Sequence, residues 1–133
     1  MTRYRLSLVV CLFLVALLGY WFRFDAPISA GLRDGIGGAA YVIFFVVAFA
    51  IVRPASSAAR IALVALTYTC VLEFLQLWHP PWLEQIRRTL PGRALLGTTF
   101  SWTDFPPYFA GAVIGWALIR SRQSAADSSR IVP

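Results

Sequence analysis

The chain has 133 residues, of which 59% are hydrophobic and 14% charged, and its formal net charge is +6. Its mean hydropathy is +0.68, whereas soluble proteins carry roughly 25% charged residues, so a soluble fold could not bury this much apolar side chain. The arginines stand singly between apolar runs and form no basic patch, which argues against nucleic acid as a partner. The composition therefore indicates an integral membrane protein.

The first predicted membrane span is residues 6–22, an uncharged run that follows Arg3 and Arg5. It ends in Tyr20, Trp21 and Phe22, aromatic residues typical of a membrane–water interface. A cleaved signal peptide is the alternative, because basic residues lead the run and Ala30 could end a cleavage site. The run exceeds the usual hydrophobic region of about 7–15 residues, so we predict a retained span.

The second and third predicted spans are residues 36–52 and 61–78, and His79-Pro80-Pro81 ends the third. The next segment, 82–90, has an amphipathic pattern that predicts a helix lying in the interface within the third loop. Its apolar side holds Trp82, Leu83, Ile86 and Leu90, and its polar side holds Glu84, Gln85, Arg87 and Arg88.

The fourth predicted span is residues 105–119, for which Asp104 is the expected N-cap, with prolines in the first turn. It is about 22 Å long at 1.5 Å per residue, so residues 93–102 are expected to dip into the interface. Residues 120–133 are polar and predict a disordered cytoplasmic tail. The predicted fold class is all-α: a single domain, residues 1–119, that forms an integral membrane bundle of about four transmembrane helices with one interfacial helix.

The distribution of arginines predicts that both termini are cytoplasmic in a bacterial cytoplasmic membrane. In the predicted topology seven arginines lie on the side of the termini and five on the other side. The seven are Arg3, Arg5, Arg53, Arg60, Arg120, Arg122 and Arg130. The five are Arg23, Arg33, Arg87, Arg88 and Arg93.

No metal or cofactor is predicted. Cys11 and Cys70 both lie inside apolar runs, where cysteine behaves as a small buried hydrophobe. His79 has no second ligand at a metal-binding spacing.

Polar residues within the predicted spans mark a candidate site. Thr69, Glu73 and Gln76 share one face of the third span, and an intramembrane carboxylate costs about 2.5–3.5 kcal/mol at mid-bilayer, so this face should point into the bundle. Asp104 and Tyr108 share a face of the last span with Gly111 and Gly115, whose spacing permits close helix contact.

The predicted topology places the polar residues near the same outer surface. This candidate ligand-binding cluster comprises Arg33, Asp34, Glu73, Gln76, Arg93, Asp104 and Tyr108. A purely structural interpretation stays open beside it: Glu73 would pair with Arg93 or Arg33, Asp104 would only cap its helix, and Tyr108 would be an interfacial aromatic.

The order Glu73-x-x-Gln76, Arg93, Asp104, Tyr108, Gly111 and Gly115 resembles the small bacterial membrane proteins of domain of unknown function 2809, and more distantly the VanZ-like proteins associated with teicoplanin resistance. The resemblance implies that Asp34, Glu73, Gln76, Arg93 and Asp104 form the family's polar signature. Tyr108 stands where the VanZ-like pattern has Asn, which favours the uncharacterised family. The implied setting is the bacterial envelope, without an implied reaction.

Four functions remain open, and we favour a non-catalytic one. In the first, an outward polar pocket binds a membrane lipid or an amphiphilic envelope ligand, with Arg93 and Arg33 holding an anionic group and Trp82 and Trp102 an apolar part. The second is an accessory or assembly subunit that docks on another membrane protein. The third is an intramembrane enzyme with Glu73 or Asp104 as general base and Arg93 as electrostatic stabiliser. The fourth is proton-coupled transport, for which a bundle this narrow would have to form a homo-oligomer.

Overall fold

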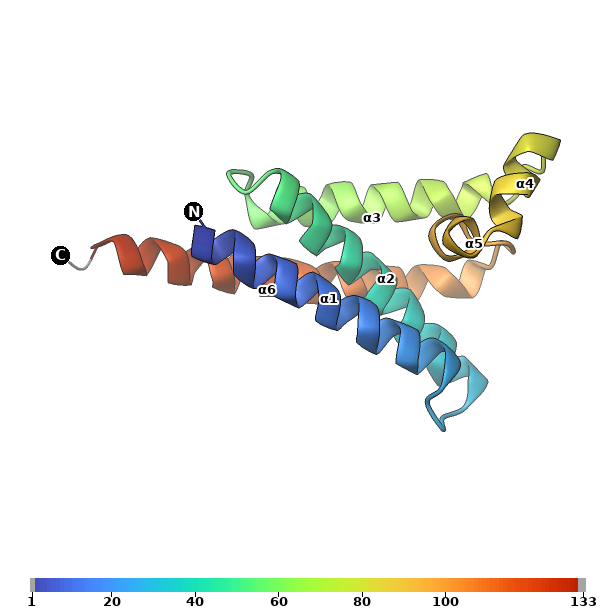
Figure 1. Ribbon diagram of the computed structural model, residues 1–133, viewed down its shortest axis with the longest axis horizontal. Helices are drawn as coiled ribbons and strands as arrows, with labels where there is room; N and C mark the ends of the chain where they lie inside the picture. Colours follow the sequence, from blue (N-terminus) through green and yellow to red (C-terminus); the bar gives the residue numbers. More distant parts are fainter. Residues whose placement is uncertain (1, 132–133) are drawn as a thin grey trace.

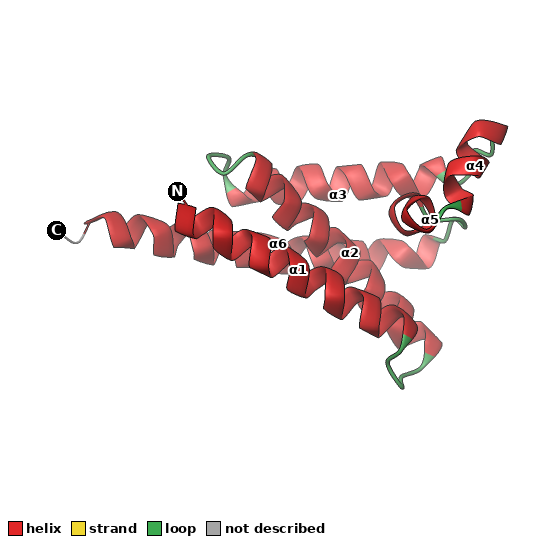
Figure 2. Ribbon diagram, viewed as in Figure 1, coloured by secondary structure: helices red, strands yellow, loops and turns green. Residues whose placement is uncertain are grey.

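A computed structural model describes residues 2–131, and within these the chain forms only helices and loops (Figure 2). The long helices are α1 (Thr2–Phe24), α2 (Ala30–Val52), α3 (Ala58–Leu75) and α6 (Phe105–Ile131). Between α3 and α6 come two short helices and one 3-10 turn, namely α4 (Pro81–Arg88), α5 (Leu90–Leu96) and η1 (Trp102–Asp104).

The helix boundaries follow local capping chemistry more closely than the ends of the apolar runs. The Ser29 and Ser57 hydroxyls accept hydrogen bonds from the backbone N–H groups of Leu32 and Arg60, each at 3.4 Å, and so begin α2 and α3. The α2 helix therefore starts six residues before the predicted 36, and α3 starts three residues before the predicted 61. Hydropathy identifies only the apolar part of a helix. The helix itself is longer, because polar turns at its ends are helical too.

The third helix ends at Leu75, earlier than the predicted 78. Gln76, Leu77 and Trp78 donate their backbone N–H groups to carbonyls three residues back, so the chain tightens into turns before the prolines. Two backbone carbonyls at this helix end accept hydrogen bonds from a side chain of α4, described below.

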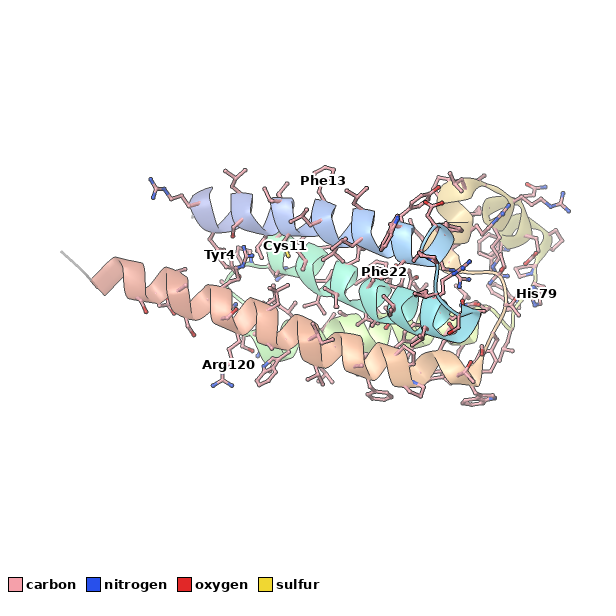
Figure 3. The ribbon with its side chains drawn as sticks, turned by 90° about the horizontal axis from the view of Figure 1, so that it is seen from below. Tyr4, Cys11, Phe13, Phe22, His79 and Arg120 are labelled. Carbon is pink, nitrogen blue, oxygen red and sulfur yellow. The ribbon has the colours of Figure 1, made fainter. Side chains whose placement is uncertain are left out.

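Helix α2 lies at the centre of the bundle and packs against α1, α3 and α6 (Figure 1). Its side chains Val42, Val46, Val47 and Ala50 are fully buried. The outer helix α1 packs mainly on α2, and the labelled Phe13 points away from the bundle (Figure 3) with 72% of its surface exposed. The start of α1 and the end of α6 lie at one end of the bundle, whereas α4 and α5 lie at the other (Figure 1).

The two glycines of the last helix lie directly against α2. A Cβ atom added at Gly111 would come within 2.5 Å of the Ala39 carbonyl oxygen, and one added at Gly115 would come within 2.9 Å of the Val46 side chain. The backbones of α2 and α6 therefore approach more closely than any larger residue would permit at these positions.

The described part of the tail differs from the predicted disorder, because α6 continues without a break to Ile131. Ala and Gln favour helix, and Gln123 donates to the Ser56 carbonyl at 2.8 Å, which ties this turn to the α2–α3 loop. Residues 132 and 133 of the predicted tail lie outside the described residues.

Three helices are long and apolar enough to cross a membrane: Arg3–Phe24, Ala30–Val52 and Ala58–Leu75. The predicted all-helical architecture is confirmed for residues 2–131, and its spanning helices indicate a membrane protein. The predicted fourth span and the interfacial position of α4 are considered under the proposed function.

Candidate functional site

The polar face of α3 points into the bundle, as its spacing predicted. Thr69 is 0% exposed, Glu73 1% and Gln76 7%. The Thr69 hydroxyl donates to the Leu66 carbonyl of its own helix at 2.9 Å, so it needs no partner from elsewhere. Glu73, one turn further on, has partners outside α3, and Gln76 donates to Glu73.

The Glu73 carboxylate accepts three hydrogen bonds from three parts of the chain. Its Oε2 accepts from the Tyr108 hydroxyl at 2.8 Å and from Nε2 of Gln76 at 2.9 Å. Its Oε1 accepts from the backbone N–H of Ser101 at 2.8 Å. All three contacts have lengths typical of good hydrogen bonds. We call Glu73, Gln76, Tyr108 and the Ser101 amide the Glu73 network.

Gln76 also explains the conformation of the loop that follows α5. Gly97 has φ of 66° and ψ of 179°, a region that residues with a side chain rarely adopt. A Cβ atom added there would lie 2.6 Å from Nε2 of Gln76. The loop therefore passes directly over the Gln76 amide, and this close approach requires glycine at position 97.

Asp104 lies beside the Glu73 network and is half-buried. Its burial and the nearby Glu73 carboxylate raise the pKa of the Asp104 carboxyl, while Arg23 acts in the opposite direction. Phe74 stacks near Phe100, Trp102 and Phe105, with ring centroids 5.5–6.1 Å apart, and these rings line the same end of the bundle. The site thus combines two carboxyl groups with an aromatic rim.

The remaining residues of the predicted cluster lie at this end but do not join the network. Arg33 donates to the carbonyls of Ala26 and Ile28 at 3.2 and 3.3 Å, and Asp34 forms an ion pair with Arg23. Arg93 is exposed on α5. Among the described residues Glu73 forms no ion pair with Arg33 or Arg93, so that pairing is replaced by the three hydrogen bonds above.

Arg87 is a structural residue that the amphipathic pattern placed wrongly on the polar side of its helix. Its side chain is 3% exposed, and its guanidinium donates to the carbonyls of Leu75 and Trp78, each at 2.8 Å. It also contacts Glu84 at 2.6 Å. Arg87 therefore satisfies carbonyls at the end of α3, where the helix dipole favours a cation.

The α3–α4 turn also contains His79, whose Nδ1 lies 3.0 Å from Oε1 of Glu84. Figure 3 places the labelled His79 at the end of the molecule away from Tyr4 and Arg120. Hydrogen bonds from His79 and Arg87 lower the pKa of the Glu84 carboxyl below its usual value of 4.5. Together with Arg87, these contacts attach α4 firmly to the end of α3.

These contacts attach residues 79–104, which we call the cap, to Glu73 and to the end of α3. Within the described chain neither Arg88 nor Arg93 has an ion-pair partner, and both are exposed. Trp82, Leu90 and Trp102 are 55%, 74% and 70% exposed. The exposed surface of the cap is therefore cationic and apolar.

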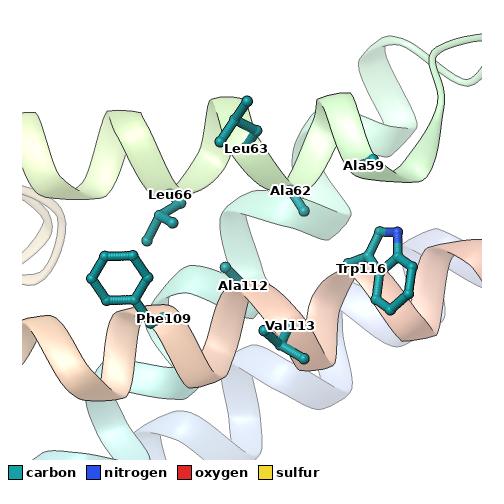
Figure 4. Close-up of a pocket in the computed structure, with 8 residues that line it drawn as sticks. All are labelled: Ala59, Ala62, Leu63, Leu66, Phe109, Ala112, Val113 and Trp116. Atoms are coloured by element: carbon teal, nitrogen blue, oxygen red, sulfur yellow. The ribbon is translucent and has the colours of Figure 1, made fainter.

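Two further surface features lie away from the cap. One is an apolar groove of about 300 Å³ between α3 and α6, whose floor includes Ala62 and Ala112 and whose walls include Leu66, Phe109 and Trp116 (Figure 4). The other is a groove between α1 and α6 that contains two arginines, considered below.

Helix architecture and site together define a multi-helical membrane protein with a buried carboxylate network at one end. The model of the family described as "Protein of unknown function (DUF2809)" matches residues 28–112, and the chain belongs to this family. The match covers α2, α3, the cap and the first part of α6, including Glu73, Gln76 and Tyr108. No solved structure matches the chain significantly.

Proposed function

We propose that this protein is a non-catalytic, four-span protein of the bacterial cytoplasmic membrane whose cap binds the anionic headgroup of an amphiphilic envelope molecule. The observation that carries the proposal is the Glu73 network. It holds the cap against α3 and α6 through Gln76, Tyr108 and Ser101, so that the exposed Arg88 and Arg93 are presented on a preorganised surface.

The fourth span in this proposal is the apolar part of α6, residues 105–119. Tyr108, Ala112 and Ile119 are buried in the bundle, and Gly111 and Gly115 lie against α2. Because α6 packs closely along α2, we expect both helices to cross the membrane. At about 22 Å the apolar part is short for a hydrocarbon core of about 30 Å, and local thinning of the bilayer would accommodate the difference.

The cap is proposed to lie at the outer interface with α4 on the membrane surface. The exposed aromatic residues of the cap suit that position, because tryptophan prefers the headgroup region. Since the predicted topology has more arginines on the side of the termini, the positive-inside rule favours a cap outside the cell. The VanZ-like resemblance supports the same envelope setting.

The ligand chemistry follows from the exposed residues of the cap. Guanidinium groups bind phosphate or carboxylate through paired N–H donors, and Trp82, Leu90 and Trp102 offer apolar surface beside them. An anionic headgroup joined to an apolar chain matches both features. Both oxygens of Glu73 accept hydrogen bonds already, which favours a structural role for this carboxylate over that of a general base.

The test is a binding measurement on the full chain in phosphatidylcholine nanodiscs. Short-chain phosphatidylglycerol is titrated while tryptophan fluorescence is recorded, and short-chain phosphatidylcholine serves as the neutral comparison. We expect saturable binding of phosphatidylglycerol that weakens at least tenfold in the Arg88→Ala/Arg93→Ala variant. An Arg5→Ala/Arg53→Ala variant removes the same charge from the opposite end and should bind normally.

Two results would overturn the proposal: equal responses to both lipids, or unchanged affinity when Arg88 and Arg93 are removed. Equal weakening in both double variants would also count against it, since that result reflects net charge alone.

An accessory role is the second proposal, and the exposure of α1 favours it. This helix packs mainly on α2 and leaves Leu6, Phe13 and Leu17 more than 60% exposed. A partner helix could cover this face. Cysteine crosslinking at Phe13→Cys in membranes, with Cys11 and Cys70 replaced by Ala, would trap a contact between two copies; Leu63→Cys on α3 is the matched exposed position.

A further inference from the structure

The groove between α1 and α6 differs from the other described surface cavity in having a charged end. It encloses about 400 Å³ and is lined by Arg3, Leu6, Ser7, Val10, Cys11 and Leu14 of α1, with Arg122 from α6. The groove between α3 and α6 has only apolar lining. The groove on α1 is thus apolar along its length and cationic at one end.

The register of α1 produces the apolar part of this groove. Leu6, Val10 and Leu14 follow one another at intervals of four residues, so their side chains form a strip along one face of the helix. The strip is about 12 Å long at 1.5 Å per residue. All three side chains are more than half exposed, and they lie within the predicted first span, where lipid chains are the surrounding medium.

Arg3 continues the same face, three residues before Leu6, and Arg122 reaches the groove from α6. The Arg122 guanidinium donates to the Ser7 carbonyl at 3.4 Å, which holds it at the head of the groove. That bond uses one of its five N–H donors. Two arginines therefore line the same end of the groove.

No carboxylate neutralises this pair in the part of the chain that the structure describes. The ion pairs there join Arg23 to Asp34 and Glu84 to His79 and Arg87, all at the far end of the helices. Two like charges at one site repel each other unless an anion lies between them. The groove is therefore complementary to a ligand with an anionic head and an apolar chain.

We propose that the groove between α1 and α6 binds one anionic phospholipid, with its phosphate between Arg3 and Arg122 and an acyl chain along Leu6, Val10 and Leu14. Basic pockets between membrane helices hold phospholipid headgroups in this way. The site lies at the end of the bundle opposite the cap, and it depends on α1 being in the membrane but not on ligand binding by the cap.

The experiment is native mass spectrometry of the full chain released from nanodiscs made of equal parts phosphatidylglycerol and phosphatidylcholine. The wild-type chain should retain one phosphatidylglycerol in preference to phosphatidylcholine. In the Arg3→Ala/Arg122→Ala variant this preference should fall at least tenfold. The matched control is Arg5→Ala/Arg120→Ala, which removes two charges two residues away on the same helices and should keep the preference.

A second variant tests the apolar part of the site without changing charge. Val10→Trp would fill the strip, and we expect it to lose the retained lipid while both arginines stay in place. Circular dichroism on each variant checks that helix content is unchanged, and adding inorganic phosphate during release tests whether the headgroup alone explains binding.

Three outcomes would overturn the proposal. The first is equal loss in the Arg3/Arg122 variant and its control, which would mean general electrostatics. The second is undiminished retention in Val10→Trp, which would remove the acyl chain from the site. The third is complete displacement by free phosphate, which would indicate an anion site without lipid specificity. The Arg88→Ala/Arg93→Ala variant should retain this lipid normally, so failure of the cap proposal is separable from failure here.

Discussion

The Tyr108 hydroxyl donates to Oε2 of Glu73 at 2.8 Å, and this bond joins two helices across 35 residues of sequence. Both side chains are buried, Tyr108 being 6% exposed and Glu73 1%. The same oxygen accepts from Gln76, so the carboxylate brings together α3, α6 and the loop before η1. Stability of the whole end of the bundle should depend on this contact.

Tyr108→Phe should lower the free energy of unfolding by about 1–2 kcal/mol. The change removes one hydrogen bond to a buried carboxyl group while leaving the ring in place, and this range is the upper part of that measured for side-chain hydrogen bonds in membrane proteins. Unfolding with dodecyl sulfate in mixed micelles, followed by circular dichroism, provides the measurement. Tyr20→Phe, at a 58% exposed position, is the control. Equal stability of the two variants would contradict the role of the network.

Arg87→Ala should destabilise the protein by about 2–4 kcal/mol, because it leaves the Trp78 carbonyl without this donor, removes one of the two donors to the Leu75 carbonyl and leaves Glu84 without its arginine partner. Arg87→Lys should restore only part of this loss, since an ammonium lacks the planar fork. The same unfolding assay applies, with the exposed neighbour Arg88→Ala as the control. A small effect of Arg87→Ala, similar to that of Arg88→Ala, would show that the contact contributes little.

The α3–α4 turn should loosen in acid. The pKa of Glu84 is lowered in the folded chain by hydrogen bonds from His79 and Arg87, so its contribution to stability is present above pH 4.5 and is lost as the pH falls through the lowered value. Trp78 and Trp82 lie 5.6 Å apart at this turn, and their fluorescence should change below pH 4.5. The Glu84→Gln variant should lack this transition; its persistence there would assign the change to another group.

Gly111→Ala should destabilise the bundle by about 1–3 kcal/mol. Alanine favours helix over glycine by about 1 kcal/mol, but the added Cβ would meet the Ala39 backbone, which cannot move aside as a flexible side chain can. Gly35→Ala is the matched control, because nothing lies within 4 Å of its added Cβ. The control should be neutral or slightly stabilised. If both variants behaved alike, α2 and α6 would not be as close as described.

The four-span topology can be tested by cysteine labelling in intact cells. Cys11 and Cys70 are replaced by Ala, and single cysteines are placed at the exposed positions Gly31, Ala55, Thr98 and Ser124. An impermeant maleimide should label Gly31→Cys and Thr98→Cys only. Labelling at Ala55→Cys and Ser124→Cys instead would invert the orientation, and labelling at Thr98→Cys together with Ser124→Cys would mean that α6 does not span.

Helical periodicity was sufficient to predict which faces of α3 and α6 meet the bundle. The burial of Glu73 and Gln76 and the position of Gly111 against α2 both follow from spacings within a single helix. Such spacings are local properties, so they can be read from the residues alone. The apolar runs also located the four long helices, although capping serines extended α2 and α3 at their starts and α6 continues past the predicted 119 to Ile131.

The sequence could not predict contacts that depend on how the cap folds back. The Ser101 amide contacts Glu73 where the loop passes over Gln76 at Gly97. Every residue type except proline has a backbone N–H, so the identity of residue 101 does not indicate this contact. Arg87 was placed on the polar side because an amphipathic pattern treats every arginine as exposed. Its spacing from Glu84 and its position shortly after a helix end were the available signals.

A predicted topology does not determine which side chains touch, as the cluster residues Arg33, Asp34 and Arg93 show. All three belong to segments at the same end of the bundle as Glu73, but Arg33 binds carbonyls of the α1–α2 loop, Asp34 pairs with Arg23, and Arg93 is exposed on α5. Sharing one end of a bundle does not by itself bring side chains into contact, because each can bind a nearer partner on its own loop or helix.

The distance in sequence between Glu73 and Tyr108 also has a consequence for biosynthesis. A ribosome releases Glu73 well before the residues that supply two of its three donors, Ser101 and Tyr108. Until they arrive, the third helix carries a carboxylate with only Gln76 beside it, at a depth where lipid disfavours charge. We therefore expect membrane integration of α3 to depend on completion of α6, so that a nascent chain that ends before Tyr108 should remain with the insertion machinery or be degraded.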